Sequence, residues 1–191
     1  MAHNSKLMGY IFSKLHNLLF ASNHYKILML GLDASGKTTI LNKIKGKESV
    51  RYEGVGFHAE ILFYMRLIKI ISWDLGGATR MEKLLYKYYF PNTDGIIFII
   101  DSHDKDRFDE AIECFQDILE ADELKNFPIL IMANKQDLNE TLSSDEISFF
   151  LKNEKYKDRK WSIIKTSGIS GQGLEEGMQW MVSSIRKIKE K

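Results

Sequence analysis

Cysteine is almost absent from this chain of 191 residues, which contains only one. A single cysteine excludes a disulfide bond within the chain and is consistent with a reducing, cytosolic setting. Cys114 lies within a helical pattern of apolar residues, so we expect it to contribute to core packing.

The sequence also lacks an apolar run approaching the eighteen or so residues of a membrane-spanning helix, and no cleavable signal peptide is evident. Its net charge is +1, which gives no reason to expect binding to nucleic acid. Hydrophobic residues make up 44% and charged residues 28%, an ordinary globular balance. These limits fit one α/β domain with additional residues at its ends.

The most informative stretch is GLDASGKTT, from Gly31 to Thr39. It matches the phosphate-binding pattern GxxxxGK[ST], and it lies between a strand-like apolar run and residues with helical spacing. Its glycines let successive backbone N–H groups turn toward one anion, and the helix beginning near Lys37 adds its positive dipole end. The alternative is a glycine turn without a ligand, although both flanking elements favour the phosphate loop.

Residues of this loop have distinct expected roles. Lys37 would reach the β and γ phosphates of a nucleotide, and the Thr38 hydroxyl would ligate Mg²⁺. The other candidate contacts to the nucleotide are Asp33, Ala34, Ser35, Gly36 and Thr39.

Residues 1–24 precede this core as a separate unit. Apolar residues recur every three or four positions from Met8 to Leu19, which predicts a short amphipathic helix. The helix could seek a membrane surface or pack permanently on the domain. Ala2 rules out myristoylation of the chain as written, but the segment from Met8 to Ser13 fits the acylation pattern M-G-x-x-x-[ST]. Whether Met8 is the native start, with Gly9 as acceptor, stays open.

From residue 25 onward, strand and helix patterns alternate. The predicted strands are Tyr25–Leu30, Phe57–Met65, Leu67–Trp73, Gly95–Ile100, Ile129–Ala133 and Trp161–Lys165. Helices are predicted after Lys37, around Leu84–Tyr88, over Asp106–Ala121, from a capping box at Ser143 and Glu146 through Leu151, and over Leu174–Lys189.

This order predicts an α/β fold with a six-stranded, mostly parallel sheet, helices on both faces, and ligand loops at the carboxyl ends of the strands. The second and third strands have almost no connector and read as a tight hairpin. We expect a mobile loop over Gly46–Gly56 and a solvated connection over Lys152–Lys160.

Asn134-Lys135-Gln136-Asp137 is the second decisive signal, because it directly follows a buried strand about a hundred residues after the phosphate loop. The Asp137 carboxylate can accept hydrogen bonds from guanine N1–H and its exocyclic amine, which adenine cannot supply in that arrangement. Asn134 would brace neighbouring loops, and the Lys135 stem would lie along the base plane. A backbone N–H at Ser167 or Gly168, after the last strand, could contact guanine O6.

Together these residues resemble the Arf and Arf-like small GTPases, from about Gly9 to the C-terminus. The matching segments are GLDASGKTT with Asp33, WDLGG at Trp73–Gly77, Tyr89-Phe90 before Asn92-Thr93, Ile100-Asp101-Ser102, Ala133–Asp137, and Gly171-Gln172-Gly173-Leu174 with Gly177 and Trp180.

The resemblance implies a P-loop small-GTPase fold, with an N-terminal extension at residues 1–24 and a guanine-nucleotide-binding domain at residues 25–191. It also implies a monomeric switch that binds GTP or GDP with Mg²⁺, and that acts in intracellular trafficking with effector, exchange-factor and activating proteins. The expected location is the cytoplasm, with peripheral membrane association when the N-terminal helix is released.

Further site residues follow from the resemblance alone. Asp74 would join Thr38 at Mg²⁺, and Gly54 and Gly77 would contact the nucleotide. The family's exposed hydrophobic effector surface corresponds to Phe57, Trp73 and Tyr89, for which ordinary core packing is the alternative.

Two departures from the family pattern concern catalysis. Gly54 replaces a threonine whose hydroxyl would bind Mg²⁺, so its amide remains and the metal ligand is lost. Ala78 replaces the glutamine that positions the attacking water, and a methyl group cannot orient water. Lys37 is then the remaining catalytic candidate, and we expect weak intrinsic hydrolysis.

Three functions compete. The first is a GTP-hydrolysing switch, and the second is a GTP-binding docking or scaffold protein that does not hydrolyse its ligand. The third is a P-loop kinase that uses ATP, which gives no reason for the residues from Asn134 to Asp137.

Overall fold

The computed structural model describes residues 25–44, 49–54, 57–64, 68–72, 90–151 and 159–190. Three predictions therefore fall wholly or largely outside the described residues: the amphipathic helix within residues 1–24, the helix around Leu84–Tyr88, and the connection over Lys152–Lys160.

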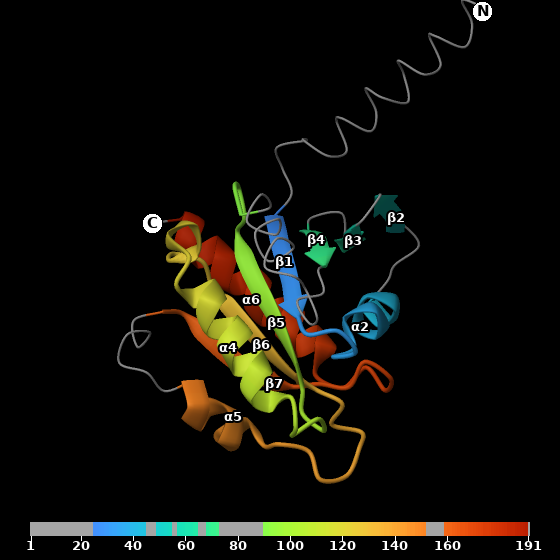
Figure 1. Ribbon diagram of the computed structural model, residues 1–191. Coiled ribbons are helices and arrows are strands. Elements are labelled where there is room, and N and C mark those ends of the chain that lie inside the picture. The colour runs from blue at the N-terminus through green and yellow to red at the C-terminus, as the bar shows by residue number, and fades with distance from the viewer. Residues whose placement is uncertain are drawn as a thin grey trace, which may run out of the picture.

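A single seven-stranded sheet forms the centre of the molecule, in the order β2-β3-β4-β1-β5-β6-β7 (Figure 1). The pairs β4–β1, β1–β5, β5–β6 and β6–β7 are parallel, whereas β2–β3 and β3–β4 are antiparallel. The mostly parallel sheet and the predicted hairpin, now β3–β4, are both confirmed. The strands are β1 (Tyr25–Gly31), β2 (Ser49–Gly54), β3 (Phe57–Tyr64), β4 (Ile68–Ser72), β5 (Gly95–Asp101), β6 (Ile129–Asn134) and β7 (Trp161–Lys165).

The predicted number of six strands is wrong, because part of the expected mobile loop forms β2. This strand pairs antiparallel with β3, in a register that runs from Ser49 opposite Leu62 to Gly54 opposite Phe57. Val50 and Tyr52 alternate with two charged residues, and this short period of two is the signal that could have identified the strand.

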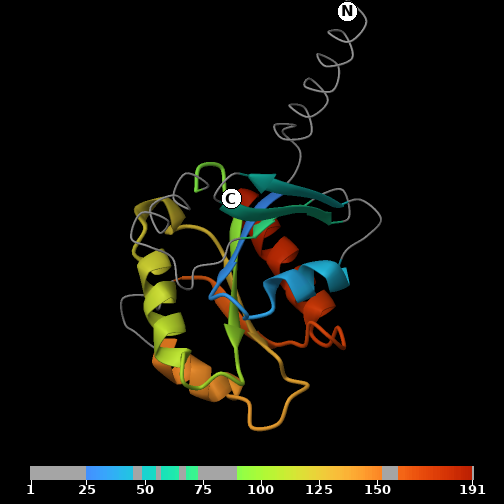
Figure 2. The same ribbon diagram turned by 45° about the vertical axis from the view of Figure 1, so that its right-hand side comes forward.

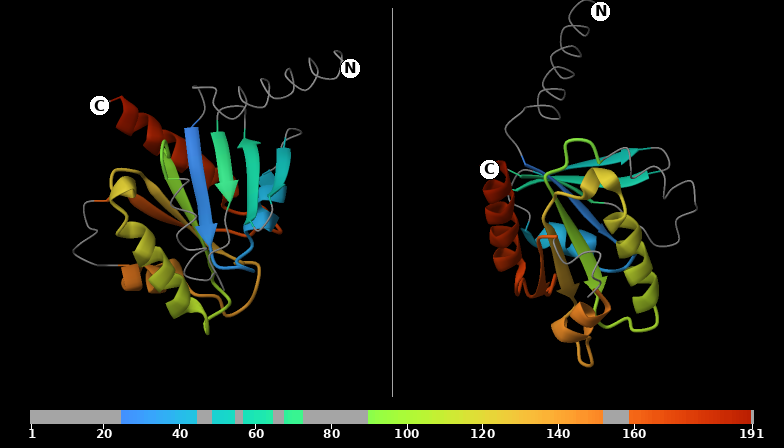
Figure 3. Two further views of the ribbon diagram at one scale, coloured as in Figure 1. Left: turned by 45° about the horizontal axis from the view of Figure 1, so that its top comes forward. Right: turned by 90° about the vertical axis from the view of Figure 1, so that its left-hand side faces the viewer.

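Helices cover both faces of the sheet, as predicted (Figure 3). One face carries α4 and α5, and the other carries α2 and α6, as Figures 1 and 2 also show. The helices are α2 (Lys37–Ile44), α4 (Phe108–Leu119), the 3-10 helix η2 (Asp122–Leu124), α5 (Ser144–Leu151) and α6 (Leu174–Lys189).

Strand β5 shows why the sheet needs both layers. Ile96, Phe98 and Ile100 pack into the hydrophobic cluster under α4, whereas Ile97 and Ile99 pack into the cluster under α2 and α6. Each fully buried side chain of this size contributes about 1.5–3 kcal/mol by leaving water. The unbroken apolar run therefore forms a central strand covered on both faces, as predicted.

The start of α5 follows directly from its sequence. The Ser143 backbone N–H donates to Glu146 Oε2 at 2.7 Å, and the Glu146 N–H donates to Ser143 Oγ at 3.2 Å. This reciprocal pair is the predicted capping box, and it satisfies two backbone donors that the helix itself cannot.

The parallel arrangement gathers the loops after β1, β5, β6 and β7 at one edge of the sheet (Figure 1). At the opposite edge, the last turn of α6 returns to the start of β1, where Lys189 Nζ lies 2.7 Å from Asp94 Oδ1 and 5.1 Å from the centre of the Tyr25 ring. Within the described ranges, no helix has both the length and the apolar character that crossing a membrane requires.

Candidate nucleotide-binding site

The phosphate loop joins β1 to α2 and requires special backbone geometry. Ala34 has φ +57° and Gly36 has φ +97°, both in the left-handed region. A Cβ atom at Gly36 would lie 2.3 Å from Asn134 Nδ2, so the next loop approaches too closely for any side chain at this position. The glycine therefore sets the distance between two of the candidate ligand loops.

Lys37 is the buried cation of this loop, at the first residue of α2. Its Nζ donates to the carbonyl oxygen of Gly31 at 2.9 Å, to that of Leu32, and to Ser35 Oγ at 3.2 Å. These acceptors hold a positive charge inside the loop, beside the backbone N–H groups at the start of α2. The arrangement suits a phosphate, because charge and helix dipole favour an anion at the same place.

Asn134 connects three loops from its buried position at the end of β6. Its Nδ2 donates to the Ser35 carbonyl at 2.9 Å, and its Oδ1 accepts from the Gly168 N–H at 3.0 Å and from Thr166 Oγ1 at 3.4 Å. The bracing that the sequence predicts for this side chain is thus present. One buried side chain thus joins the phosphate loop to the two loops expected around the base.

Asp137, the predicted base-selecting carboxylate, is exposed and lies against the loop after β7. Its Oδ1 accepts a hydrogen bond from Ser167 Oγ at 2.5 Å, and Ser167 Oγ in turn accepts the Ser170 N–H at 3.0 Å. Ser167 therefore orients the carboxylate from the side.

The two backbone amides expected to contact guanine O6 already donate within the protein. The Ser167 N–H bonds to the Gln172 carbonyl at 3.1 Å, and the Gly168 N–H bonds to Asn134 Oδ1 at 3.0 Å. A base oxygen at this position would have to share the Gly168 donor with Asn134.

Lys135 lies between these loops and the end of β5, in the left-handed conformation with φ +66°. Its Nζ pairs with Asp101 Oδ2 at 2.6 Å, while Asp101 Oδ1 accepts the backbone N–H groups of His103 and Asp104. Asp101, the last residue of β5, thus fixes the direction of the lysine stem.

Sequence reasoning missed a second ion pair, which lies between an arginine and a carboxylate at the outer side of the phosphate loop. Arg107 Nη2 lies 2.7 Å from Asp33 Oδ1, and Arg107 Nε lies 2.9 Å from Glu110 Oε2. The hydrogen bond from Arg107 lowers the pKa of Asp33, with weaker help from the charge of Lys37. No pattern could have identified Arg107, because 74 residues separate it from its partner.

Several predicted site residues lie outside the described residues: Trp73, Asp74, Gly77, Ala78 and Tyr89. Gly54 and Phe57 face each other as the last backbone pair of the β2–β3 hairpin. Thr38 and Thr39 are exposed in the first turn of α2, where the Thr38 hydroxyl is a suitable magnesium ligand beside a bound phosphate. Among the described residues, no group of three or more His, Cys, Asp or Glu could hold a metal ion.

A comparison with protein families matches residues 11–185 to the model of the ADP-ribosylation factor family. Among characterised proteins, ADP-ribosylation factor 3 of Arabidopsis thaliana is 41% identical over 180 residues, which cover 94% of this chain and 98% of that protein.

Among solved structures, the Arl6 BBS3 small GTPase from Trypanosoma brucei, with bound nucleotide analogue GppNp, is similar with a TM-score of 0.71. Its sequence is 27% identical, and the match covers 86% of this chain and 98% of that one. The family match extends over the phosphate loop, the loops joined by Asn134 and the sheet between them.

Proposed function

The chain belongs to the ADP-ribosylation factor family of GTP-binding molecular switches, and from this premise we propose that it binds GTP and GDP together with Mg²⁺, acts as a switch in intracellular trafficking, and hydrolyses GTP weakly on its own. Members of the family hydrolyse GTP in general, and the question for this chain is its own rate.

The Asn134 brace is the observation that carries the proposal for nucleotide binding. It holds the phosphate loop, through the Ser35 carbonyl, at a fixed distance from the loop that carries Ser167 and Gly168. A ligand with phosphates at one end and a base at the other fits loops locked together in this way. An ATP-using kinase does not need a carboxylate at Asp137.

We assign the residues as follows. The phosphates would lie against the backbone of Asp33, Ala34, Ser35 and Gly36, against Lys37, Thr38 and Thr39, and against the backbone of Gly54 and Gly77. The base would lie against Asn134, Lys135, Asp137, Ser167 and Gly168, and Mg²⁺ against Thr38 and Asp74. Bound Mg²⁺ would neutralise phosphate charge, while Lys37 supplies the cation that the protein itself holds in the loop.

Equilibrium titration with fluorescent GDP, competed by unlabelled nucleotides, tests the base assignment. GTP and GDP should compete strongly and ATP weakly, and Asp137→Asn should shift the preference from guanosine to xanthosine nucleotides because the carboxylate is the proposed acceptor for both guanine donors. Equal competition by ATP and GTP in the unmodified protein would reject a guanine site.

Weak hydrolysis is proposed because Gly54 and Ala78 stand where the family has threonine and glutamine. Removing one preorganised donor from an active site costs on the order of 10² to 10³ in rate. An activating protein can restore hydrolysis, since an arginine supplied in trans contributes roughly 10³ to 10⁵.

Single-turnover hydrolysis by purified protein distinguishes a slow switch from the docking protein that never hydrolyses GTP. We expect a slow rate, raised by Ala78→Gln combined with Gly54→Thr. A fast unassisted rate would show that another residue positions the water, and this interpretation of Ala78 would be wrong.

The N-terminal extension, residues 1–24, is proposed to bring a monomeric protein from the cytoplasm to a membrane surface in its GTP state, with Phe57, Trp73 and Tyr89 facing effectors. Its amphipathic pattern supports this role. Deleting residues 1–20 should abolish GTP-dependent binding to liposomes and leave nucleotide affinity nearly unchanged. Liposome binding that ignores the nucleotide would instead indicate a permanent anchor, and no liposome binding in either state would indicate a permanently packed helix.

A further inference from the structure

The phosphate loop contains a negative charge that a site for anions does not need. Asp33 lies between Gly31 and Lys37, and half of its side chain is exposed, at 52%. Lys37 is close enough for its charge to act on this carboxylate. A bound phosphate beside Lys37 would therefore also be exposed to the repulsion of Asp33.

Arg107 balances that charge from a different element. It is the residue before α4, and its side chain does not cap that helix. Instead, Nη2 contacts Asp33 Oδ1 at 2.7 Å, and Nε donates to Glu110 Oε2 at 2.9 Å. Glu110 therefore holds the Nε side of the guanidinium, while Nη2 reaches the phosphate loop.

The geometry of the loop around this contact supports a directional role. Asp33 and Arg107 line a small cavity of about 10 Å³ between the phosphate loop and α4, together with Leu32, Asp104 and Phe108. The ion pair thus lies on the side of the loop that faces α4, whereas Lys37 Nζ lies among the loop's own carbonyl groups. The carboxylate and the ammonium are drawn in different directions.

We propose that Arg107 is a positioning residue for the phosphate site: it neutralises Asp33 and holds this carboxylate against α4, away from bound phosphates. The proposal rests on the proposed function. Since GTP carries more negative charge than GDP, the repulsion that Arg107 removes is larger for GTP. Arg107 therefore shifts the preference of the site toward the triphosphate.

The test is a double-mutant cycle on the full chain, with affinities for GDP and for a non-hydrolysable GTP analogue measured by titration at low ionic strength. Arg107→Gln should weaken binding of the analogue roughly tenfold and binding of GDP roughly threefold, as expected for an added like charge at partial screening. Added salt should reduce both losses.

The decisive variant adds Asp33→Asn to Arg107→Gln. With no carboxylate left to repel the phosphates, both affinities should return to within about twofold of the unmodified protein. Asp33→Asn alone removes the repelling carboxylate and should tighten binding of the analogue slightly more than binding of GDP. Arg107→Lys, which keeps the charge, should lose at most about threefold. Glu110→Gln is the matched control for the other partner, and it should lose less than Arg107→Gln.

Three results would overturn the proposal: unchanged affinities in Arg107→Gln, equal losses for the two nucleotides, or a loss that Asp33→Asn fails to rescue. The last result would give Arg107 a purely structural role at the start of α4. If the unmodified protein binds no guanine nucleotide, the proposed function fails as well. If the unmodified protein binds guanine nucleotides but Asp33→Asn does not restore the affinity of Arg107→Gln, only the positioning role of Arg107 is rejected.

Discussion

Asn134 and Gly36 depend on each other at the residue scale. The asparagine amide nitrogen lies 2.3 Å from where a Cβ atom on residue 36 would be. Its three hydrogen bonds join it to the Ser35 carbonyl, the Gly168 N–H and the Thr166 hydroxyl. Each such bond contributes about 0.5–1.5 kcal/mol, but a buried group that loses its partner costs about 1–3 kcal/mol. The site is consequently more sensitive to a lost brace than to a lost surface contact.

Ser167→Ala should weaken guanine-nucleotide binding without unfolding the protein. The change removes the 2.5 Å hydrogen bond to Asp137 Oδ1, so the proposed base acceptor loses its orientation. We expect the Kd for GDP to rise about fivefold, which corresponds to about 1 kcal/mol, measured by titration with fluorescent GDP.

The matched control is Ser170→Ala, which keeps the backbone N–H that bonds to Ser167 and removes only an oxygen that accepts from Gln172. It should bind GDP nearly normally. Equal losses in the two variants would mean that loop stability, rather than the orientation of Asp137, determines affinity.

At the scale of elements, sequence patterns predicted most of the fold, because each predicted element either has a regular apolar pattern over many residues or has ends that are marked by capping residues. β7 and α6 have the predicted bounds, and the capping box identified the start of α5. β2 was missed because only two apolar residues alternate in it and its stability depends on pairing with β3.

The candidate site divides in the same way. Lys37, Asn134 and Asp137 belong to local motifs whose spacing carries the chemistry, and they could be identified from the sequence. The pairs Arg107–Asp33 and Lys135–Asp101 form only when the ends of parallel strands meet. No pattern within one segment encodes such contacts.

Ser143→Ala should destabilise the protein by about 1 kcal/mol, the usual cost of losing a serine N-cap. The hydroxyl accepts the Glu146 N–H, and the variant leaves that donor without its partner in the protein. Urea unfolding followed by circular dichroism measures the change, with Ser144→Ala, one residue into α5, as the control. A midpoint that moves equally in both variants would show that the capping box contributes nothing specific.

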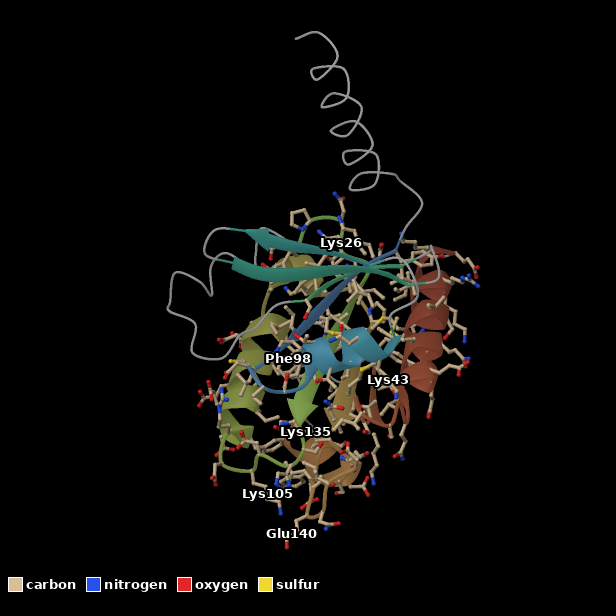
Figure 4. The ribbon with its side chains drawn as sticks, turned by 90° about the vertical axis from the view of Figure 1, so that its right-hand side faces the viewer. Lys26, Lys43, Phe98, Lys105, Lys135 and Glu140 are labelled. Carbon is tan, nitrogen blue, oxygen red and sulfur yellow. The ribbon has the colours of Figure 1, made fainter. Side chains whose placement is uncertain are left out.

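Across the whole molecule, two charged regions lie at opposite ends of the sheet. Figure 4 shows Lys135, Lys105 and Glu140 toward the end that carries the candidate site, and Lys26 at the other end. There Lys26 donates to the Pro91 carbonyl at 2.8 Å, while Asp94 accepts the Lys26 backbone N–H and pairs with Lys189. This second region can be changed without touching the candidate site.

Partial burial lowers the pKa of Lys26 from 10.5 to about 8, with further lowering by the charge of Lys69 on β4 and opposition from Asp94. Below about pH 8 the ammonium is charged in both the folded and the unfolded protein, so its full desolvation cost weakens the fold. Between about pH 8 and 10.5 the folded protein loses this proton first, because the unfolded chain keeps the ordinary lysine pKa. The contribution of Lys26 to stability must therefore become less unfavourable as the pH rises through this range.

Lys26→Met should remove this pH dependence. We expect the free energy of unfolding of the unmodified protein, relative to the variant, to increase by about 1 kcal/mol from about pH 7 to about pH 10. The effect is well below that of a buried lysine because the Lys26 side chain is about half-exposed to solvent. Urea unfolding at several pH values measures the difference, in which the separate contribution of Lys69 largely cancels because both proteins contain it. Lys105→Met, which removes an exposed lysine near the candidate site, is the control for the loss of one positive charge. The difference in the free energy of unfolding between the unmodified protein and Lys26→Met could instead stay constant over this range. That result would mean that Lys26 keeps an ordinary pKa in the folded protein and that its burial beside Pro91 costs no stability at neutral pH.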